Sequence, residues 1–197
     1  MTDRRAVAVA GHTGDVSTAR RGLTHPDGAV RATALGALDR LGALPDGELT
    51  RALDDEDATV RRRAAELAAR HHGIDLLPVL GDDDASVVEA AAWACGEREA
   101  VSDAVLGSLV ELATGGGAPL VRESAVAALG ALADERGLDA ILAGTTDKPA
   151  IRRRAVLALA PFVGPDHARA EEVAAALQRA LTDRDWQVRQ AAEDVMP

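Results

Sequence analysis

The chain of 197 residues has very few of the side chains that β-sheets favour. It contains no tyrosine, one phenylalanine and two tryptophans, and its apolar content of 47% consists mainly of alanine, leucine and valine. Antiparallel sheets favour aromatic and β-branched residues, whereas small aliphatic residues suit closely packed helices. The composition therefore predicts an all-α protein.

Cysteine is also scarce, because Cys95 is the only one. A single cysteine excludes a disulfide framework and a cysteine-rich metal site. Cys95 occupies a position that holds leucine in the related segments described below, so we expect a buried, inert thiol. The glycine run at residues 115–117 lacks the Gly-Lys-Ser/Thr ending of a phosphate-binding loop. We therefore predict a protein that is not an enzyme and needs no cofactor.

Basic residues are outnumbered, with 22 bases against 32 acids and a formal charge of -10. Proteins that bind nucleic acid usually carry a basic footprint, so this balance disfavours nucleic acid as the partner. Long hydrophobic runs are missing from the first residues, which are too polar for a signal peptide or a membrane span. We expect a soluble, cytoplasmic protein without membrane contact.

One motif recurs six times along the chain, and LDDEDATVRRRA at residues 53–64 is a representative copy. Each copy has a leucine, a short turn, a β-branched anchor residue and an alanine four positions after the anchor. Arginine follows the anchor in five copies, and Val88 is the exception. Recurrence at an average spacing of about 32 residues predicts a repeat architecture. The anchors are Val30, Val60, Val87, Val121, Ile151 and Val188.

Each period predicts two helices. In the second helix of the representative copy, the apolar stripe comprises Val60, Ala64, Leu67, Ala68 and His71, with the 3.6-residue period of a core-facing helix. An aspartate three residues before the anchor, or a proline two residues before it, is expected at the start of this helix. These residues are Asp27, Asp57, Asp84, Asp185, Pro119 and Pro149.

The motif D-x-x-V-R-x-x-A resembles HEAT repeats, and in particular the short phycobilisome-lyase-type HEAT-like repeats. The resemblance begins at about Asp15 and implies an α-solenoid of about six helix–turn–helix repeats in a single domain, residues 1–197. The expected repeats are residues 15–42, 43–72, 73–97, 98–133, 134–163 and 164–197, with residues 1–14 as a partial N-terminal cap.

The resemblance also implies a ladder of hydrogen bonds and ion pairs along the stack, between turn aspartates and the arginines that follow the anchors. His25, Gly116 and Thr146 replace the aspartate in three turns, so we expect the ladder to be incomplete. The predicted members are Asp55, Arg61, Asp82, Arg122, Arg152, Asp183 and Arg189.

A partner-binding surface is predicted where the second helices line a concave face, as the resemblance implies. Arg62 and Arg63 recur as Arg153 and Arg154, with glutamates at matching positions between them. This alternation suits a specific protein partner better than a continuous phosphate backbone. The alternative is a solvated helix face with local pairs, such as Arg62 with Glu66. The predicted set is Arg62, Arg63, Glu89, Trp93, Glu123, Arg153 and Arg154.

Trp93 and Trp186 each have two interpretations. Trp93 belongs either to an interface, as an aromatic anchor, or to the packing against a neighbouring helix. Trp186 begins the last predicted helix, where it covers the end of the stack or joins two chains. We expect a complete array that is a monomer or a weak homodimer.

Acidic runs at residues 54–57 and 82–84 invite a metal interpretation, but neither has the glycine of a calcium loop. Capping and ladder roles account for most of these acids. His71, His72 and Asp75 make a poor ligand set, so no metal site is predicted.

Three functions follow from these observations. The first is a non-catalytic scaffold or adaptor that binds a protein or peptide along its concave face. The second, implied by the resemblance, is a lyase-like enzyme subunit that acts with a partner. The third is a HEAT-like nucleic-acid-binding protein, which the acidic charge and the scarcity of aromatic residues disfavour.

Overall fold

A computed structural model describes residues 3–196 of the chain, and all regular structure in this range is helical. Twelve α-helices and three short 3-10 helices occur there, without a strand. The predicted all-α class is thus confirmed. The chain divides into two compact units between Ala94 and Cys95. The prediction of a single domain stays a prediction.

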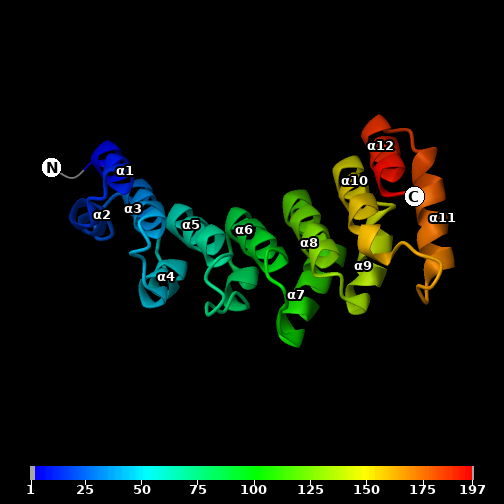
Figure 1. Ribbon diagram of the computed structural model, residues 1–197, viewed down its shortest axis with the longest axis horizontal. Coiled ribbons are helices and arrows are strands. Elements are labelled where there is room, and N and C mark those ends of the chain that lie inside the picture. The colour runs from blue at the N-terminus through cyan, green and yellow to red at the C-terminus, as the bar shows by residue number, and fades with distance from the viewer. Residues whose placement is uncertain (1–2, 197) are drawn as a thin grey trace. The chain divides into compact units, whose positions relative to one another are not determined.

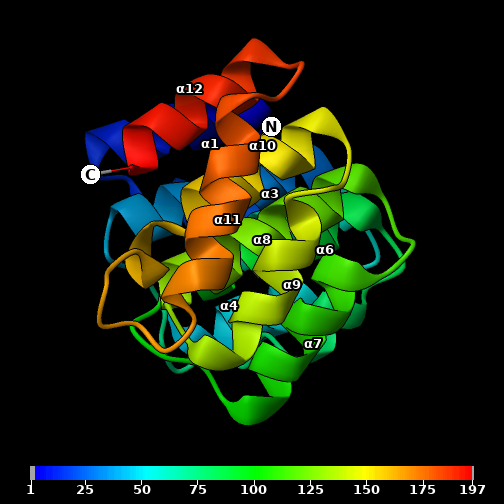
Figure 2. The ribbon, with the colours of Figure 1, turned by 90° about the vertical axis from the view of Figure 1, so that its right-hand side faces the viewer.

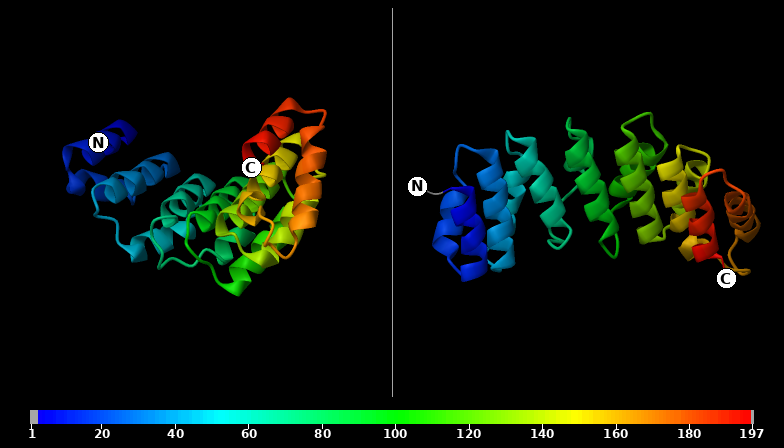
Figure 3. Two further views of the ribbon diagram at one scale, coloured as in Figure 1. Left: turned by 45° about the vertical axis from the view of Figure 1, so that its right-hand side comes forward. Right: turned by 90° about the horizontal axis from the view of Figure 1, so that it is seen from above.

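Unit 1 contains two helix pairs and a row of second helices. Within it, α2 pairs with α3 and α4 pairs with α5, while α3 also lies against both α1 and α5 (Figures 1 and 3). The surface of α1, α3, α5 and the start of α6 that faces away from α2 and α4 is called the second-helix face. The helices are α1 (Arg4–Thr13), α2 (Val16–Gly22), α3 (Gly28–Arg40), α4 (Asp46–Leu53), α5 (Ala58–Ala68) and α6 (Ala85–Gly96).

The third period departs from the prediction of two helices in every repeat. Its first half contains only a short 3-10 helix, η1 (Pro78–Gly81). The interval from Val60 to Val87 is the shortest between anchors, and Pro78 has no N–H for a longer helix. The segment still fills the core, because Ile74 and Leu76 are buried. The prediction of a first helix was therefore wrong in this repeat.

Unit 2 contains three complete helix pairs. Within it, α7 pairs with α8, α9 with α10 and α11 with α12, and α10 also lies against α8 and α12 (Figure 2). Its 3-10 helices are η2 (Glu135–Gly137) and η3 (Ala160–Phe162). The α-helices are α7 (Asp103–Thr114), α8 (Pro119–Leu132), α9 (Leu138–Gly144), α10 (Pro149–Ala158), α11 (Ala170–Leu181) and α12 (Trp186–Val195).

The predicted helix starts are confirmed. The Asp27, Asp57 and Asp185 carboxylates each accept a hydrogen bond from the N–H two residues later, at 2.8 to 2.9 Å. Asp84 accepts one from the N–H of Ser86 at 2.8 Å. Each cap satisfies a backbone donor that the helix itself leaves without a partner. Pro119 and Pro149 occupy the first positions of α8 and α10.

Small residues let neighbouring second helices approach closely. A Cβ atom added at Gly130 of α8 would lie 2.7 Å from the Cα atom of Ala158 in α10. A Cβ atom added at Gly11 of α1 would lie 2.9 Å from the Cα atom of Ala37 in α3. Both distances are too short for a real side chain, so glycine is required at these two contacts.

Arginine–aspartate pairs join consecutive turns within each unit. In every pair the guanidinium donates two hydrogen bonds to the two carboxylate oxygens, the fork geometry that is strongest for this pair. The N···O distances range from 2.6 to 3.2 Å. The pairs are Arg31–Asp55 and Arg61–Asp82 in unit 1, and Arg122–Asp147 and Arg152–Asp183 in unit 2.

Each pair is also bonded to the backbone of both turns that it joins. The remaining nitrogen of Arg61 donates to the carbonyl of Asp55, in its own turn, at 2.9 Å. In the next turn, the Asp82 carboxylate accepts the N–H of Asp84 at 2.8 Å. The Arg61 and Asp82 side chains are only 18% and 11% exposed, so a partner lost here leaves a poorly solvated charge.

Some members of this ladder differ from those expected. Asp147, one residue after Thr146, supplies the carboxylate in a turn where the motif has none at its usual position. Arg31 is a member that the predicted set omitted. Arg189 donates to the carbonyls of Asp183 and Arg184, and within residues 3–196 it has no ion pair with a carboxylate.

We predict that Asp82→Asn lowers the free energy of unfolding by about 1.5 to 3 kcal/mol at pH 7, because it removes a charge-assisted bond from a shielded arginine. The hydrogen bond from Arg61 lowers the pKa of Asp82 below its ordinary 3.8. This stabilisation is therefore present above about pH 4 and is lost as the pH falls through the folded pKa. Urea unfolding at pH 7 and pH 3 measures both effects, and the exposed Asp83→Asn is the control. An equal loss in both variants would contradict the prediction.

We predict opposite effects for two glycine-to-alanine changes in unit 2. Gly130→Ala should destabilise by about 1 to 3 kcal/mol, because the new methyl group collides with the backbone of α10. Gly107→Ala in α7 should stabilise by about 0.5 to 1 kcal/mol, since nothing lies within 4 Å and alanine is the better helix former. Thermal unfolding of both variants tests this. Stabilisation by Gly130→Ala would refute the close approach of α8 and α10.

Candidate functional site

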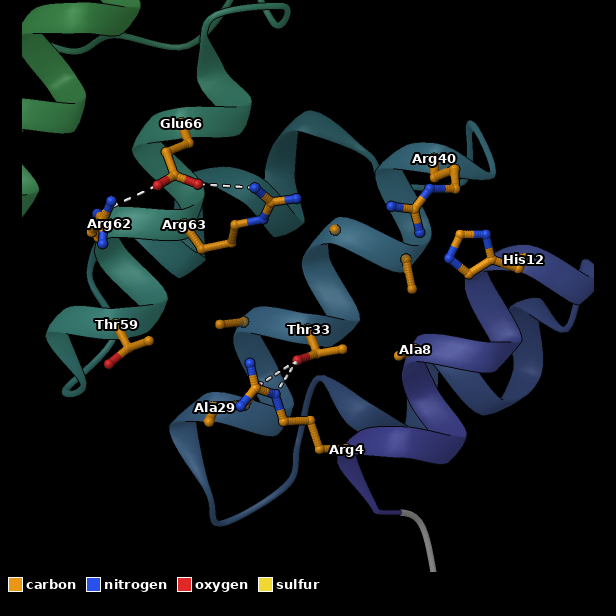
Figure 4. A pocket seen from close by; sticks show the side chains of 13 residues that line it. Arg4, Ala8, His12, Ala29, Thr33, Arg40, Thr59, Arg62, Arg63 and Glu66 are labelled. Carbon is orange, nitrogen blue, oxygen red and sulfur yellow. Dashed lines mark hydrogen bonds and ion pairs between the residues drawn. The ribbon is translucent and has the colours of Figure 1, made fainter.

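A hollow of about 450 Å³ lies on the second-helix face of unit 1, between α1, α3 and α5 (Figure 4). Its floor consists of alanine, glycine and threonine, because these helices pack through small residues. Long side chains stand around this floor. We call the hollow the basic groove, and its lining residues are Arg4, Ala8, His12, Ala29, Ala32, Thr33, Gly36, Ala37, Arg40, Thr59, Arg62, Arg63 and Glu66.

Two of the predicted partner-binding residues share one carboxylate in this groove. Arg63 Nη1 lies 2.9 Å from Glu66 Oε2, and Arg62 Nε lies 3.4 Å from Glu66 Oε1 (Figure 4). The local Arg62–Glu66 pair, which was the alternative interpretation, therefore exists. A single carboxylate neutralises only one of the two guanidiniums, and the Arg62 and Arg63 side chains are still 50% and 37% exposed.

Glycines in α1 and α3 lie under two of the arginines. A Cβ atom added at Gly36 of α3 would be 2.6 Å from Nη2 of Arg63, which reaches across from α5. A Cβ atom added at Gly11 of α1 would be 3.1 Å from Nη1 of Arg40, which belongs to α3. Each guanidinium thus lies against a glycine of the preceding second helix, a contact that any larger residue would disturb.

The charge of the basic groove is opposite to that of the chain. Four arginines and one glutamate give 4 − 1 = +3 with His12 neutral, whereas the whole chain carries -10. Among residues 3–196, Arg4 and Arg40 have no ion pair, and Arg4 Nε donates to the Thr33 hydroxyl at 3.3 Å. The site can therefore attract an anionic group.

Sequence reasoning missed Arg4, His12 and Arg40. Arg40 had a detectable signal, because it stands ten positions after the anchor Val30, as Arg70 does after Val60. Arg4 and His12 belong to α1, which precedes the first copy of the motif and was described only as part of a cap. Their contribution depends on α1 lying against α3, a contact that the motif does not encode.

A second hollow of about 370 Å³ adjoins the basic groove between α5 and α6. It shares Arg62, Arg63 and Glu66 with the groove, and Glu89 and Trp93 lie on its other side. Trp93 is 42% exposed, so its ring is accessible from this hollow. The structure thus brings together four of the seven predicted partner-binding residues, all of them in unit 1.

The other three predicted residues belong to unit 2. Arg154 of α10 pairs with Glu123 of α8 at 3.6 Å, and Arg153 is exposed. Trp186 is 64% exposed at the first position of α12. Cys95 is fully buried, as expected for an inert thiol.

His71, which was predicted in the core-facing stripe, lies three residues after the end of α5 and instead bridges α4 and α3. Its Nδ1 lies 2.7 Å from Asp46 at the start of α4, and its Nε2 lies 3.1 Å from Asp39 near the end of α3. The neighbouring Arg70 also pairs with Asp39. Burial alone would lower the pKa of His71, but the bonds to Asp46 and Asp39 outweigh it and raise that pKa.

The described residues hold neither a cluster of metal ligands nor a helix suited to a membrane. In residues 3–196, no group of three or more histidine, cysteine, aspartate or glutamate side chains is arranged to hold a metal ion. No helix in the same range has the length and apolar character to cross a membrane.

The paired helices, the repeated motif and the ladder define a helical-repeat protein of the α-solenoid class. A family model of HEAT repeats matches residues 74–160 and 108–196, which together span more than half of the chain. The chain therefore belongs to the HEAT-repeat family. No curated protein matches the sequence.

Solved structures share this fold at low identity. A designed armadillo repeat protein in complex with the peptide (KR)4 is 19% identical, with a TM-score of 0.69. The alignment covers 92% of this chain and 98% of the designed protein. A second designed armadillo repeat protein has a TM-score of 0.65 and 20% identity, covering 91% and 98%. YibA from Escherichia coli has a TM-score of 0.69 and 18% identity, covering 98% and 74%. These likenesses concern the fold alone.

We predict that protonated His71 stabilises unit 1. Because its folded pKa is raised above the ordinary 6.5, the stabilisation is complete below about pH 6 and is lost as the pH rises through the folded pKa. His71→Gln should cost about 1 to 2 kcal/mol at pH 6 and less at pH 9. Denaturant unfolding at both values tests this, with the exposed His72→Gln as the control. A cost that does not depend on pH would contradict it.

Proposed function

We propose that the chain is a non-catalytic protein-binding scaffold that holds a segment of a partner protein on the second-helix face of unit 1. The observation that carries this proposal is the basic groove with its adjoining hollow. Together they offer a row of exposed guanidiniums and a partly exposed tryptophan over a floor of small residues. Arginine and tryptophan are the side chains that most often dominate the binding energy of protein interfaces.

The side chains that line the groove are suited to binding a ligand rather than to catalysis. Its threonine hydroxyl, Thr33, donates to the carbonyl of Ala29 at 2.7 Å and accepts from Arg4, so it is engaged with its own helix and with α1. The guanidiniums are always charged at physiological pH and do not exchange protons readily. These groups can fix a ligand by charge and hydrogen bonding, which supports a scaffold over an enzyme subunit.

The ladder contributes by holding the site in place before a partner arrives. Arg31 and Arg61 fix the turns from which α3 and α5 begin, and these helices carry Arg40, Arg62 and Arg63. Less ordering is then required when the partner binds, which favours affinity. The designed armadillo repeat protein of similar fold is in complex with a peptide. Carrying peptide binding over to this chain is part of the proposal, because the two are only 19% identical.

The resemblance to phycobilisome-lyase-type repeats has no support among the comparisons, so the lyase-like alternative is not part of the proposal. Glu123, Arg153 and Arg154 of unit 2 stay predicted partner-binding residues and are not part of the groove proposal. The cytoplasmic location and the monomeric or weakly dimeric state stay predictions.

Selection from a random peptide library displayed on phage, against the full chain, tests the proposal. We expect peptides that bind the wild type to lose at least tenfold in affinity for the triple variant Arg62→Glu, Arg63→Glu, Trp93→Ala, because each removed anchor is worth about 1 kcal/mol or more. The matched control is Arg51→Glu, Arg179→Glu, Trp186→Ala, which changes exposed residues outside the groove by the same chemistry. Circular dichroism checks that both variants fold. Equal affinity of the selected peptides for both triple variants would refute the proposal.

A further inference from the structure

The sign of the charge in the basic groove identifies the kind of segment that it binds. The groove carries +3 on a chain of -10. At physiological ionic strength the Debye length is about 8 Å. The field of acids on distant turns is therefore screened, whereas the charged side chains that line the groove act on a ligand directly. We infer, resting on the proposed function, that the groove binds an extended, acidic segment of a partner protein through aspartate or glutamate side chains.

The arginines are arranged to receive carboxylates. The guanidiniums of Arg40 and Arg63 lie against Gly11 and Gly36, where the absence of a side chain leaves room for them. Because the guanidinium is a planar fork, it loses little freedom for each of the two parallel hydrogen bonds that a carboxylate accepts. Arg40 has no ion pair within the described part of the chain, and Arg63 shares its only carboxylate with Arg62.

Helix spacing sets the expected pattern of acids. Neighbouring packed helices lie about 8 to 10 Å apart. An extended chain in the polyproline II conformation advances about 3.1 Å per residue and brings every third side chain to the same face. A segment that crosses α3 and α5 therefore passes one helix about every third residue. Acids three residues apart would meet successive arginines.

The negative charge of Glu66 favours a peptide over a nucleic acid as the ligand. It stands between Arg62 and Arg63 and lines both hollows. A phosphate backbone carries a charge on every unit, so it would bring one against this carboxylate. A peptide avoids the repulsion by placing a neutral residue there.

Fluorescence anisotropy with the full chain and three labelled peptides of equal length tests the inference. The peptides carry glutamate, glutamine or lysine at every third position, with glycine and serine between. We expect the glutamate peptide to bind at least tenfold more tightly than the glutamine peptide, with an advantage that shrinks as sodium chloride is raised.

Four single variants, one of them a control, make the test specific. Arg40→Gln and Arg63→Gln should each weaken the glutamate peptide by about threefold to tenfold, and Glu66→Gln should strengthen it by a similar factor, as expected for one partly exposed charge. Arg51→Gln, an exposed change on α4, should leave the affinity unaltered.

The outcomes separate this inference from the proposed function. If the glutamine or lysine peptide binds as well as the glutamate peptide, and binding still depends on Trp93, the scaffold stands and the acidic ligand is refuted. Binding of none of the three, together with no selected peptide, refutes both. A single-stranded oligonucleotide that competes equally well overturns the peptide assignment. Self-association in the ultracentrifuge that Arg40→Gln abolishes makes a second copy the occupant, which also overturns it.

Discussion

The bidentate bond between the arginine after one anchor and the aspartate of the next turn is the interaction on which each unit depends. It joins elements that are neighbours in space but 21 to 31 residues apart in sequence. Helices that pack through alanine and glycine have smooth surfaces and few interlocking side chains. A directional polar contact at each turn therefore supplies the register that such packing cannot specify by shape.

The ladder and the small residues at the helix contacts together shape the basic groove. Small residues keep the second helices close and leave a low floor, while long arginines rise from it. Arg61, which faces the turns, is bound to Asp82 and to its own turn, whereas Arg62 next to it is half exposed. Adjacent arginines on one helix thus separate into a paired arginine in the turn and an exposed arginine on the second-helix face by helical position alone.

The local features of the motif were predictable from the sequence, whereas contacts that depend on turn length or on other helices were not. The N-caps at Asp27 and Asp57 were predictable because a cap is a local interaction between a side chain and the next turn. The role of Asp147 was not predictable, because a longer turn places the carboxylate one residue later in the sequence. The guanidinium of Arg122 still reaches it. The absent first helix of the third repeat follows from a short interval and Pro78, which the motif does not contain.

Prediction of the candidate site from the sequence was limited for the same reason. Arg62 and Arg63 were predictable as departures from the repeat, but the sign of the surface around them was not. Glu89 and Glu123 indicated an alternating surface, whereas the groove is positive because Arg4 and Arg40 join it from α1 and α3. The guanidinium of Arg40 lies close against Gly11, which belongs to another helix. The charge of a groove therefore depends on which helices meet and where glycine leaves space, and neither is a property of one repeat.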